Sequence, residues 1–208
     1  SKAACVTGEL PEDILRQVDA AVLSPGVPTD IPLVDRLRQN GAEIIGEIEL
    51  GFLQEKGRVA AITGTNGKTT TTTLVGEIMK ACLGQENLFV VGNIGDPYTA
   101  EARKTTGQSV TVGESSSFQL ETTHTFHPAV SAILNITPDH LNRHHTMEAY
   151  VAAKENIAGR QTKEDICILN YENGYTRDFG DRCTARVVWF SSARELEDGY
   201  YLKDDRIY

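Results

Sequence analysis

Short apolar runs alternate with longer amphipathic stretches along most of this chain. The apolar runs are typical of buried strands, because parallel strands bury both faces and lose the polar alternation of a half-exposed strand. These runs lie at residues 19–23, 43–45, 59–63, 88–91, 109–112, 129–134 and 166–169. Between them, helical patterns cover residues 31–39, 69–82, 97–104 and 147–160. The alternation predicts the α/β class, with a mostly parallel sheet flanked by helices.

The pattern also indicates two parts that meet near residues 46–57, where a short helical segment precedes the strand at 59–63. Residues 1–46 contain only two strands and one main helix, which is too little for a hydrophobic core of their own. We therefore expect them to be the C-terminal part of a larger domain. Residues 47–208 are expected to form most of a second domain, with a hairpin over 200–208.

Composition narrows the possible functions. The chain has 208 residues, a net charge of −9 and an isoelectric point of about 5.0, which disfavours nucleic acid or an anionic membrane as its main partner. No apolar run approaches the ~20 residues of a membrane span, and no signal peptide is visible, so we expect a cytoplasmic protein. The four cysteines are scattered without a CxxC pair, which favours reduced thiols over a zinc site.

A glycine-rich segment between an expected strand and an expected helix is the most informative part of the chain. In such a loop the backbone N–H groups surround phosphate oxygens, and the following helix N-terminus adds a favourable dipole. Lys68 is placed to reach the β- and γ-phosphates of a nucleotide, and the Thr69 hydroxyl to bind Mg²⁺. The general phosphate-loop pattern has a further glycine where this chain has Ile62, so a Gly-rich turn with a chance Lys-Thr pair is the alternative. The predicted nucleotide-binding residues are Gly64, Thr65, Asn66, Gly67, Lys68, Thr69 and Thr70.

Two polar clusters follow the next two expected strands. The first is Gly92-Asn93-Ile94-Gly95, in which Asn93 either contacts a phosphate or substrate carbonyl or belongs to an ordinary turn. The second spans residues 113–121, where Glu114 is placed as an acidic Mg²⁺ ligand opposite the phosphate loop. In that cluster Ser116 and Gln119 are candidate donors to a substrate, and a solvated acidic helix start is the alternative.

A third cluster, NITPDHLNRHH at residues 135–145, follows a buried strand and precedes Tyr150 and Lys154. A histidine at such a strand end can bind a metal or pair with a phosphate. His144 and His145 are adjacent and point apart, so at most one of them serves a site. We therefore select His140 as the functional histidine, against the alternative of an ordinary surface residue.

Taken together, these motifs resemble the Mur ligases. The GTNGKTT loop, the GNIG turn, the ESSSFQLE segment and the NITPDHLNRH…Y…AAK run match that family in order and spacing. SPGVP at residues 24–28 matches a loop that contacts UDP, and SSFQLE is most similar to the member that adds D-glutamate. The resemblance implies a P-loop-type central domain over residues 47–208. It also implies that residues 1–46 end a Rossmann-like UDP-binding domain, and that the family's C-terminal domain lies outside this chain.

The resemblance further implies an ATP- and Mg²⁺-dependent ligase that joins D-glutamate to UDP-N-acetylmuramoyl-L-alanine through an acyl phosphate. It assigns catalysis to Lys68, His140 and Lys154. It implies metal ligation by Thr69, Glu114, His140 and Lys154, the last as a carbamate formed with CO₂. The substrate-side residues that it implies are Ser24, Pro25, Gly26, Asn93, Ser116 and Gln119.

Two alternatives stay open at this stage. One is a Mur-type ligase that adds a different amino acid, and the other is a non-catalytic nucleotide-binding module. Because the family holds ATP between its central and C-terminal domains, these 208 residues alone are expected to be inactive as a ligase. We expect a monomer when the protein is full length.

Overall fold

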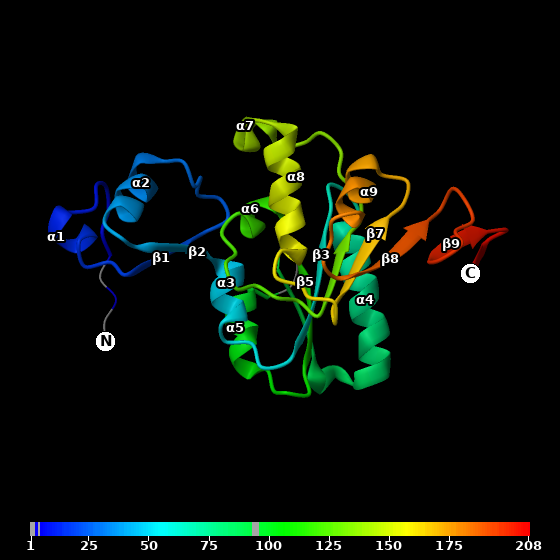
Figure 1. Cartoon of the computed structure of the whole chain (residues 1–208). Coiled ribbons are helices and arrows are strands. Elements are labelled where there is room, and N and C mark those ends of the chain that lie inside the picture. The colour runs from blue at the N-terminus through cyan, green and yellow to red at the C-terminus, as the bar shows by residue number, and fades with distance from the viewer. Residues whose placement is uncertain (1–2, 4, 93–95) are drawn as a thin grey trace.

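The computed structural model describes residues 3, 5–92 and 96–208, which contain two separate β-sheets. A two-stranded parallel sheet lies in the N-terminal part of the chain. An eight-stranded sheet lies in the larger part that follows. In Figure 1 the N-terminal part lies at one end of the molecule and the C-terminal hairpin at the other.

The N-terminal part pairs β1 (Ala20–Leu23) with β2 (Glu43–Gly46), and α2 (Pro32–Gln39) connects the two strands. Contrary to the expectation from sequence, this part has a small core of its own, to which helix α1 (Glu12–Leu15) supplies the fully buried Leu15. Helix α3 (Glu47–Phe52) begins at the residue that follows β2, so no linker separates the two parts.

The eight-stranded sheet has the order β10-β9-β8-β7-β6-β3-β5-β4. All neighbouring strands are parallel except β9 and β10. This sheet confirms the predicted α/β class with a mostly parallel sheet. Its strands are β3 (Arg58–Thr63), β4 (Leu88–Gly92), β5 (Val110–Glu114), β6 (Val130–Ile133), β7 (Ile166–Asn170), β8 (Arg186–Ser191), β9 (Tyr200–Lys203) and β10 (Arg206–Ile207).

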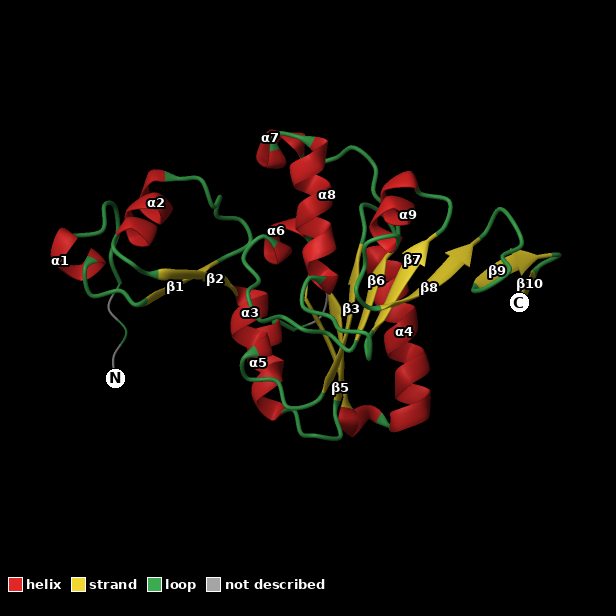
Figure 2. Ribbon diagram, in the orientation of Figure 1, coloured by secondary structure: helices red, strands yellow, loops and turns green. Residues whose placement is uncertain are grey.

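Helices cover both faces of this sheet, as Figure 2 shows. On one face α4 (Lys68–Leu83) packs Val75 and Met79 against Ile62 of β3. The further helices and short 3₁₀ turns are α5 (Tyr98–Glu101), α6 (Ser117–Leu120), α7 (Leu141–His144), α8 (Met147–Glu155), α9 (Gly174–Gly180), η1 (Gln85–Asn87), η2 (Ala102–Lys104) and η3 (Asn156–Ala158). The opposite face carries the largest core, in which Val59 and Ala61 of β3 belong to one cluster with residues of α3, α5, α6, α8 and α9.

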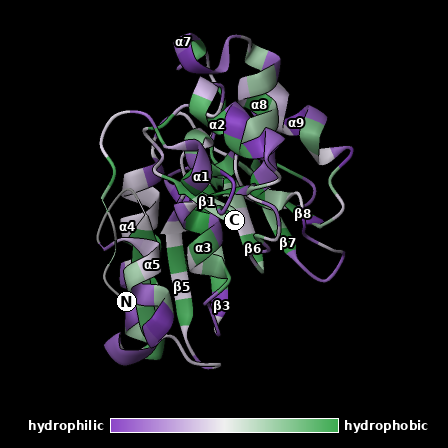
Figure 3. Cartoon of the chain, turned by 90° about the vertical axis from the view of Figure 1, so that its left-hand side faces the viewer, coloured by the Kyte–Doolittle hydropathy of each residue, from purple (hydrophilic) through white to green (hydrophobic). Residues whose placement is uncertain are grey.

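The strand at β3 shows how sequence sets this arrangement. Its residues alternate between the two cores, so an unbroken apolar run is needed to bury both faces. In Figure 3, β5 and β6 are largely hydrophobic, whereas α1 and α7 carry hydrophilic residues.

Contacts also tie the N-terminal part to the large sheet. The backbone N–H of Gly46 donates to the carbonyl of Thr122 at 3.3 Å. The Arg143 guanidinium donates to the carbonyl of Val27 at 3.1 Å. The buried carboxylate of Glu49, on α3, accepts the backbone N–H groups of residues 124, 125 and 126.

The structure differs from the predicted elements in several places and agrees at the C-terminal hairpin. The expected helices at 97–104 and 147–160 end in 3₁₀ turns, so α5 and α8 are shorter than predicted. Strand β8 and helix α9 were not predicted, although the run Val187-Val188-Trp189-Phe190 carries a strand signal. The expected hairpin at 200–208 is present as β9 and β10.

No helix in the described part of the chain is long and apolar enough to span a membrane.

The close approach of β4 to β5 at Gly92 generates a stability prediction. Gly92 has φ +113°, and a Cβ there would lie 2.1 Å from the carbonyl oxygen of Glu114. We expect Gly92→Ala to lower the free energy of unfolding in urea by about 2–4 kcal/mol, from backbone strain and overpacking. Gly113→Ala is the matched control, because its Cβ would meet only a Val91 methyl at 3.7 Å. Equal losses in the two variants would contradict the prediction.

Candidate functional site

The phosphate-loop candidate lies at the point where the strand order reverses. The chain passes from β3 outward to β4 and back to β5, and then crosses to β6 on the other side of β3. Ligands of open α/β sheets bind at the carboxyl ends of strands at such a point. Residues 64–67 connect the end of β3 to the start of α4 at Lys68, and Gly67 takes a left-handed conformation with φ +83°. The predicted strand–loop–helix arrangement is therefore present.

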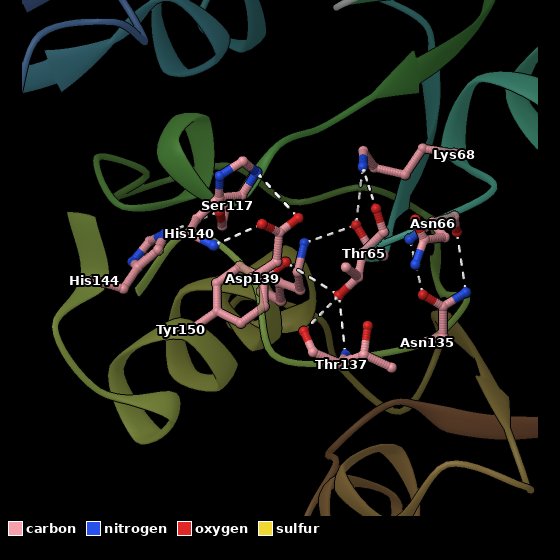
Figure 4. Close-up of polar contacts among 12 residues, drawn as sticks. Thr65, Asn66, Lys68, Ser117, Asn135, Thr137, Asp139, His140, His144 and Tyr150 are labelled. Atoms are coloured by element: carbon pink, nitrogen blue, oxygen red, sulfur yellow. Dashed lines mark hydrogen bonds and ion pairs between the residues drawn. The ribbon is translucent and has the colours of Figure 1, made fainter. Parts of the chain in front are cut away.

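Two lysine side chains converge on one carbonyl oxygen of this loop. The Lys68 ammonium donates to the carbonyl oxygens of Gly64 and Thr65, each at 3.0 Å. The Lys154 ammonium, from α8, donates to the same Gly64 oxygen at 2.8 Å. Figure 4 shows Lys68 turned back toward Thr65 in this way. Lys68, and Lys154 when it is protonated, thus place positive charge beside the loop in addition to the N-terminus of α4, which favours an anionic ligand.

Lys154 has an unusual environment for its charge. Its side chain is 2 % exposed, and its ammonium lies 4.7 Å from the centre of the Tyr150 ring. Burial, followed by repulsion from Lys68, lowers the pKa of Lys154 to about 7. A sizeable fraction of neutral amine is therefore present near neutral pH, which an exposed lysine does not provide.

The predicted metal-binding pair Thr69 and Glu114 is brought together. The Thr69 hydroxyl, at the start of α4, donates to Glu114 Oε2 at 2.9 Å. Glu114 ends β5 and is 3 % exposed, so the strand fixes its position. Within the described residues, no three His, Cys, Asp or Glu side chains are placed to hold a metal ion. A cation here would therefore need phosphate oxygens and water besides this pair, as Mg²⁺ commonly does.

The segment after β6 supports the loop from the side opposite Glu114. The side chain of Asn135 accepts from the Asn66 N–H at 2.9 Å and donates to the Asn66 carbonyl at 3.0 Å. The Thr65 hydroxyl exchanges hydrogen bonds with the backbone of Thr137 and with the Tyr150 hydroxyl. Figure 4 shows these five residues next to one another. The sequence analysis placed Asn135, Thr137 and Tyr150 in or next to a motif without a role, because their pairing with the phosphate loop joins segments about 70 positions apart.

His140 lies at the start of α7, in a left-handed conformation with φ 51°. Its backbone N–H donates to Asp139 Oδ1 at 2.8 Å, and its ring lies 5.0 Å from that of Phe118. The side chain is 49 % exposed. His140 is therefore accessible to a ligand.

The two neighbouring histidines separate as expected. His144 is buried, with one ring nitrogen 2.9 Å from the Ser117 hydroxyl and the other 3.0 Å from a Glu121 carboxylate oxygen. Burial lowers the pKa of His144 from its usual value. His145 is exposed and pairs with Asp30 at 3.2 Å. His144 thus connects α7 to α6, and His145 faces solvent.

The predicted substrate-side residues are distributed unevenly. Ser24 and Pro25 line a small cavity together with Phe118 and Gln119, so the SPGVP loop and α6 do meet. Gly26 is exposed in the adjoining turn. Ser116 and Gln119 form a capping box, in which each satisfies a backbone N–H of the other. Asn93 lies outside the described residues.

Comparisons with known proteins agree with this geometry. The Mur ligase middle domain, as a family, matches residues 62–205. The chain is 58 % identical over 206 residues to the UDP-N-acetylmuramoylalanine–D-glutamate ligase of Lachnoclostridium phytofermentans, covering 99 % of this chain and 45 % of that protein. It is 55 % identical over 207 residues to the ligase of the same name from Lachnospira eligens, covering 100 % and 46 %. The chain thus spans about half the length of the curated relatives it matches.

Solved structures give the same fold at low identity. The structure of a UDP-N-acetylmuramoyl-L-alanyl-D-glutamate–2,6-diaminopimelate ligase superposes with a TM-score of 0.58 at 18 % identity, over 91 % of this chain and 49 % of that one. A MurF ligase from Thermotoga maritima in complex with ADP superposes with a TM-score of 0.56 at 18 % identity, over 93 % and 56 %. At this identity the likeness establishes the fold alone.

The buried lysine generates a pH prediction. The pKa of Lys154 is about 7 in the folded protein and 10.5 ordinarily, so between these values the unfolded state binds more protons. Stability therefore rises with pH across this window. Relative to Lys154→Met, in CO₂-free buffer, we expect the wild-type free energy of unfolding to rise by up to ~1.4 kcal/mol per pH unit above pH ~7. Parallel pH profiles for the two proteins would contradict the assigned pKa.

Proposed function

Because this chain belongs to the Mur ligase family, we propose that it is part of an ATP-dependent ligase that joins D-glutamate to UDP-N-acetylmuramoyl-L-alanine. This activity is a step in the synthesis of the peptidoglycan precursor. The observation that carries the proposal is the phosphate loop at the switch point of the sheet, with Lys68 in the loop and Thr69 bonded to Glu114.

The proposed reaction needs activation of a carboxylate, which is a poor acylating agent at neutral pH. The substrate carboxylate attacks the γ-phosphorus of ATP, which gives an acyl phosphate and ADP. The D-glutamate amine then attacks the acyl carbon, and inorganic phosphate leaves. The protein contributes by positioning the reactants and by neutralising charge on the transferred phosphoryl group.

The roles of the loop residues follow from their chemistry. Loop backbone N–H groups and the N-terminus of α4 hold the phosphates, and Lys68 exchanges its two carbonyl acceptors for phosphate oxygens. Thr69 and Glu114 offer adjacent oxygen donors, which fit a hard cation such as Mg²⁺. Bound Mg²⁺ supplies charge neutralisation to the phosphoryl oxygens.

Lys154 is proposed to act as a carbamate. A bare ammonium repels a cation, whereas a carbamate offers it anionic oxygens. Carbamylation requires a neutral amine, and the lowered pKa of Lys154 supplies one near pH 7. His140, which is exposed just before α7, is proposed to serve, together with the Lys154 carbamate, a second Mg²⁺ near the acyl phosphate.

The muramoyl substrate is proposed to lie between the SPGVP loop and α6, where the two meet around Ser24, Pro25 and Gln119. Gly26, Ser116 and Asn93 complete the proposed substrate side. The nucleotide-sugar substrate also argues for a cytoplasmic protein, and a monomer remains our expectation for the full-length form. Binding of the amino acid is assigned to the family's C-terminal domain, which these residues do not include.

The decisive test is ADP release by a full-length protein that contains this chain, assayed with a panel of amino acids. We expect turnover with D-glutamate, and a loss of several orders of magnitude in Lys68→Ala, because the loop then lacks its cation. Lys68→Arg is expected to restore little, since a planar guanidinium differs from a compact ammonium. The isolated 208 residues are expected to release no D-glutamate-dependent ADP.

Three outcomes of this assay would contradict the proposed D-glutamate ligase activity or the proposed role of Lys68. Preference for another amino acid would favour a different Mur-type ligase. ATP binding without turnover in the full-length protein would favour the nucleotide-binding module. Near-normal activity in Lys68→Ala would remove the phosphate loop from the mechanism.

The carbamate proposal has its own test in the same full-length protein. Lys154→Ala is expected to lose most activity, and added acetate or formate is expected to restore part of it by supplying the missing carboxylate. The matched control is Lys68→Ala, which acetate is not expected to rescue. Full activity in unrescued Lys154→Ala would remove Lys154 from the mechanism, and loss without rescue would favour a direct role for the ammonium.

A further inference from the structure

The segment that follows β6 is held in an unusually regular way. Its four consecutive backbone carbonyls, at residues 134, 135, 136 and 137, each accept a hydrogen bond. The second and fourth accept from Thr65 of the phosphate loop, through its N–H at 2.9 Å and its hydroxyl at 3.2 Å. Successive carbonyls therefore point to alternate sides, as in a β-strand that is paired on both edges, and the phosphate loop lies on one of these sides.

Two asparagine side chains act as the other neighbour. Asn170, the last residue of β7, donates from Nδ2 to the Leu134 carbonyl at 2.9 Å. Asn173, just before α9, donates from Nδ2 to the Ile136 carbonyl at 2.9 Å. Only an amide nitrogen can face a carbonyl oxygen, and each Oδ1 accepts a backbone N–H, from Glu172 and Thr176 respectively. Both amides are therefore held in one orientation.

The phosphate loop depends on this segment for its own position. Asn135, between the two held carbonyls, pairs with both backbone groups of Asn66. The Thr65 N–H and hydroxyl have their acceptors there as well. The Ile136 side chain is 1 % exposed, so its backbone has no ready access to water if the Asn173 donor is lost.

We propose that Asn170 and Asn173 are positioning residues of the nucleotide site, which hold residues 134–137 as the support of the phosphate loop. The role of this support as part of a nucleotide site rests on the function proposed above. Among the described residues, neither asparagine side chain is hydrogen-bonded to residues 64–68, and both act through the carbonyls of Leu134 and Ile136. Each donor is a single side-chain nitrogen, so the proposal can be tested by small substitutions.

The alternative for Asn173 is a purely structural role as the N-cap of α9, since its Oδ1 accepts the Thr176 N–H. Asn173→Asp separates the two roles, because it keeps the capping oxygen and removes the donor. Asn173→Ser does the same without adding a charge, as serine also caps helices well. Asn170→Ser removes the other donor without touching the cap of α9, so it decides the matter if both Asn173 variants fail to fold.

Asn40→Asp is the matched control. The Asn40 Nδ2 donates to the Arg36 carbonyl at 2.8 Å in the N-terminal part. This substitution therefore removes a bond of the same type, and adds the same charge, far from the phosphate loop.

The first measurement is hydrogen exchange of the Thr65 and Asn66 amides without ligand. We expect Asn170→Ser, Asn173→Ser and Asn173→Asp to raise exchange at these amides about tenfold, since an unpaired buried carbonyl destabilises the held conformation. Melting temperatures of the three variants are expected to match that of Asn40→Asp, whose loop amides exchange as in the wild type. This measurement does not depend on ATP binding.

The second measurement is the dissociation constant of MgATP in the full-length protein that contains this chain. We expect the three variants to weaken binding about tenfold. Wild-type exchange at Thr65 and Asn66 in the folded variants would overturn the proposal, as would a defect in Asn173→Asp that Asn173→Ser does not share. Unchanged MgATP binding in Lys68→Ala would instead overturn the proposed function, and the exchange result would still decide the role of the asparagines.

Discussion

The structure depends on one constraint of topology, the central place of β3 between two parallel neighbours that the chain reaches by opposite routes. Parallel strands bring their carboxyl ends to one edge, and the reversal in strand order opens that edge beside β3. Glu114 arrives there from β5, and residues 134–140 arrive from β6. The loop that carries Lys68 is thus surrounded by segments whose positions are fixed by backbone pairing deep in the sheet.

Electrostatics at this edge run against the charge of the whole protein. The chain has a net charge of −9, yet Lys68 and Lys154 share one backbone acceptor. Bringing two ammonium groups together is unfavourable, and burial adds to the cost for Lys154, whose lowered pKa reflects both effects. A site that stabilises anions by local groups needs no basic surface, so the net charge of −9 does not conflict with the proposed nucleotide site.

Sequence predicted the strands of the sheet and the phosphate loop, because each depends on a local pattern. It also predicted the approach of Thr69 to Glu114, because the carboxyl ends of parallel strands meet at one edge of a sheet. It did not predict β8, whose apolar run is short and lies between Arg186 and Ser191. It also missed the pairing of Asn66 with Asn135 and the support given by Asn170 and Asn173. Those contacts depend on register between distant segments, which no single pattern encodes. The sequence singled out Ser116 and Gln119 as candidate substrate contacts, and the structure shows that they also form a capping box. The same polar residue types suit both roles, so the sequence alone did not reveal the cap.

The direct passage from β2 into α3 at Gly46 has a mechanical consequence. Flexible linkers allow neighbouring domains to reorient, and none exists at this junction. Glu49, three residues into the next element, anchors α3 to the backbone of residues 124–126, and Arg143 fastens the loop that contains Val27. The N-terminal sheet is therefore connected directly to the larger part, without a flexible linker between them. The SPGVP loop is thus held against the larger part both by the continuous chain and by the hydrogen bond from Arg143.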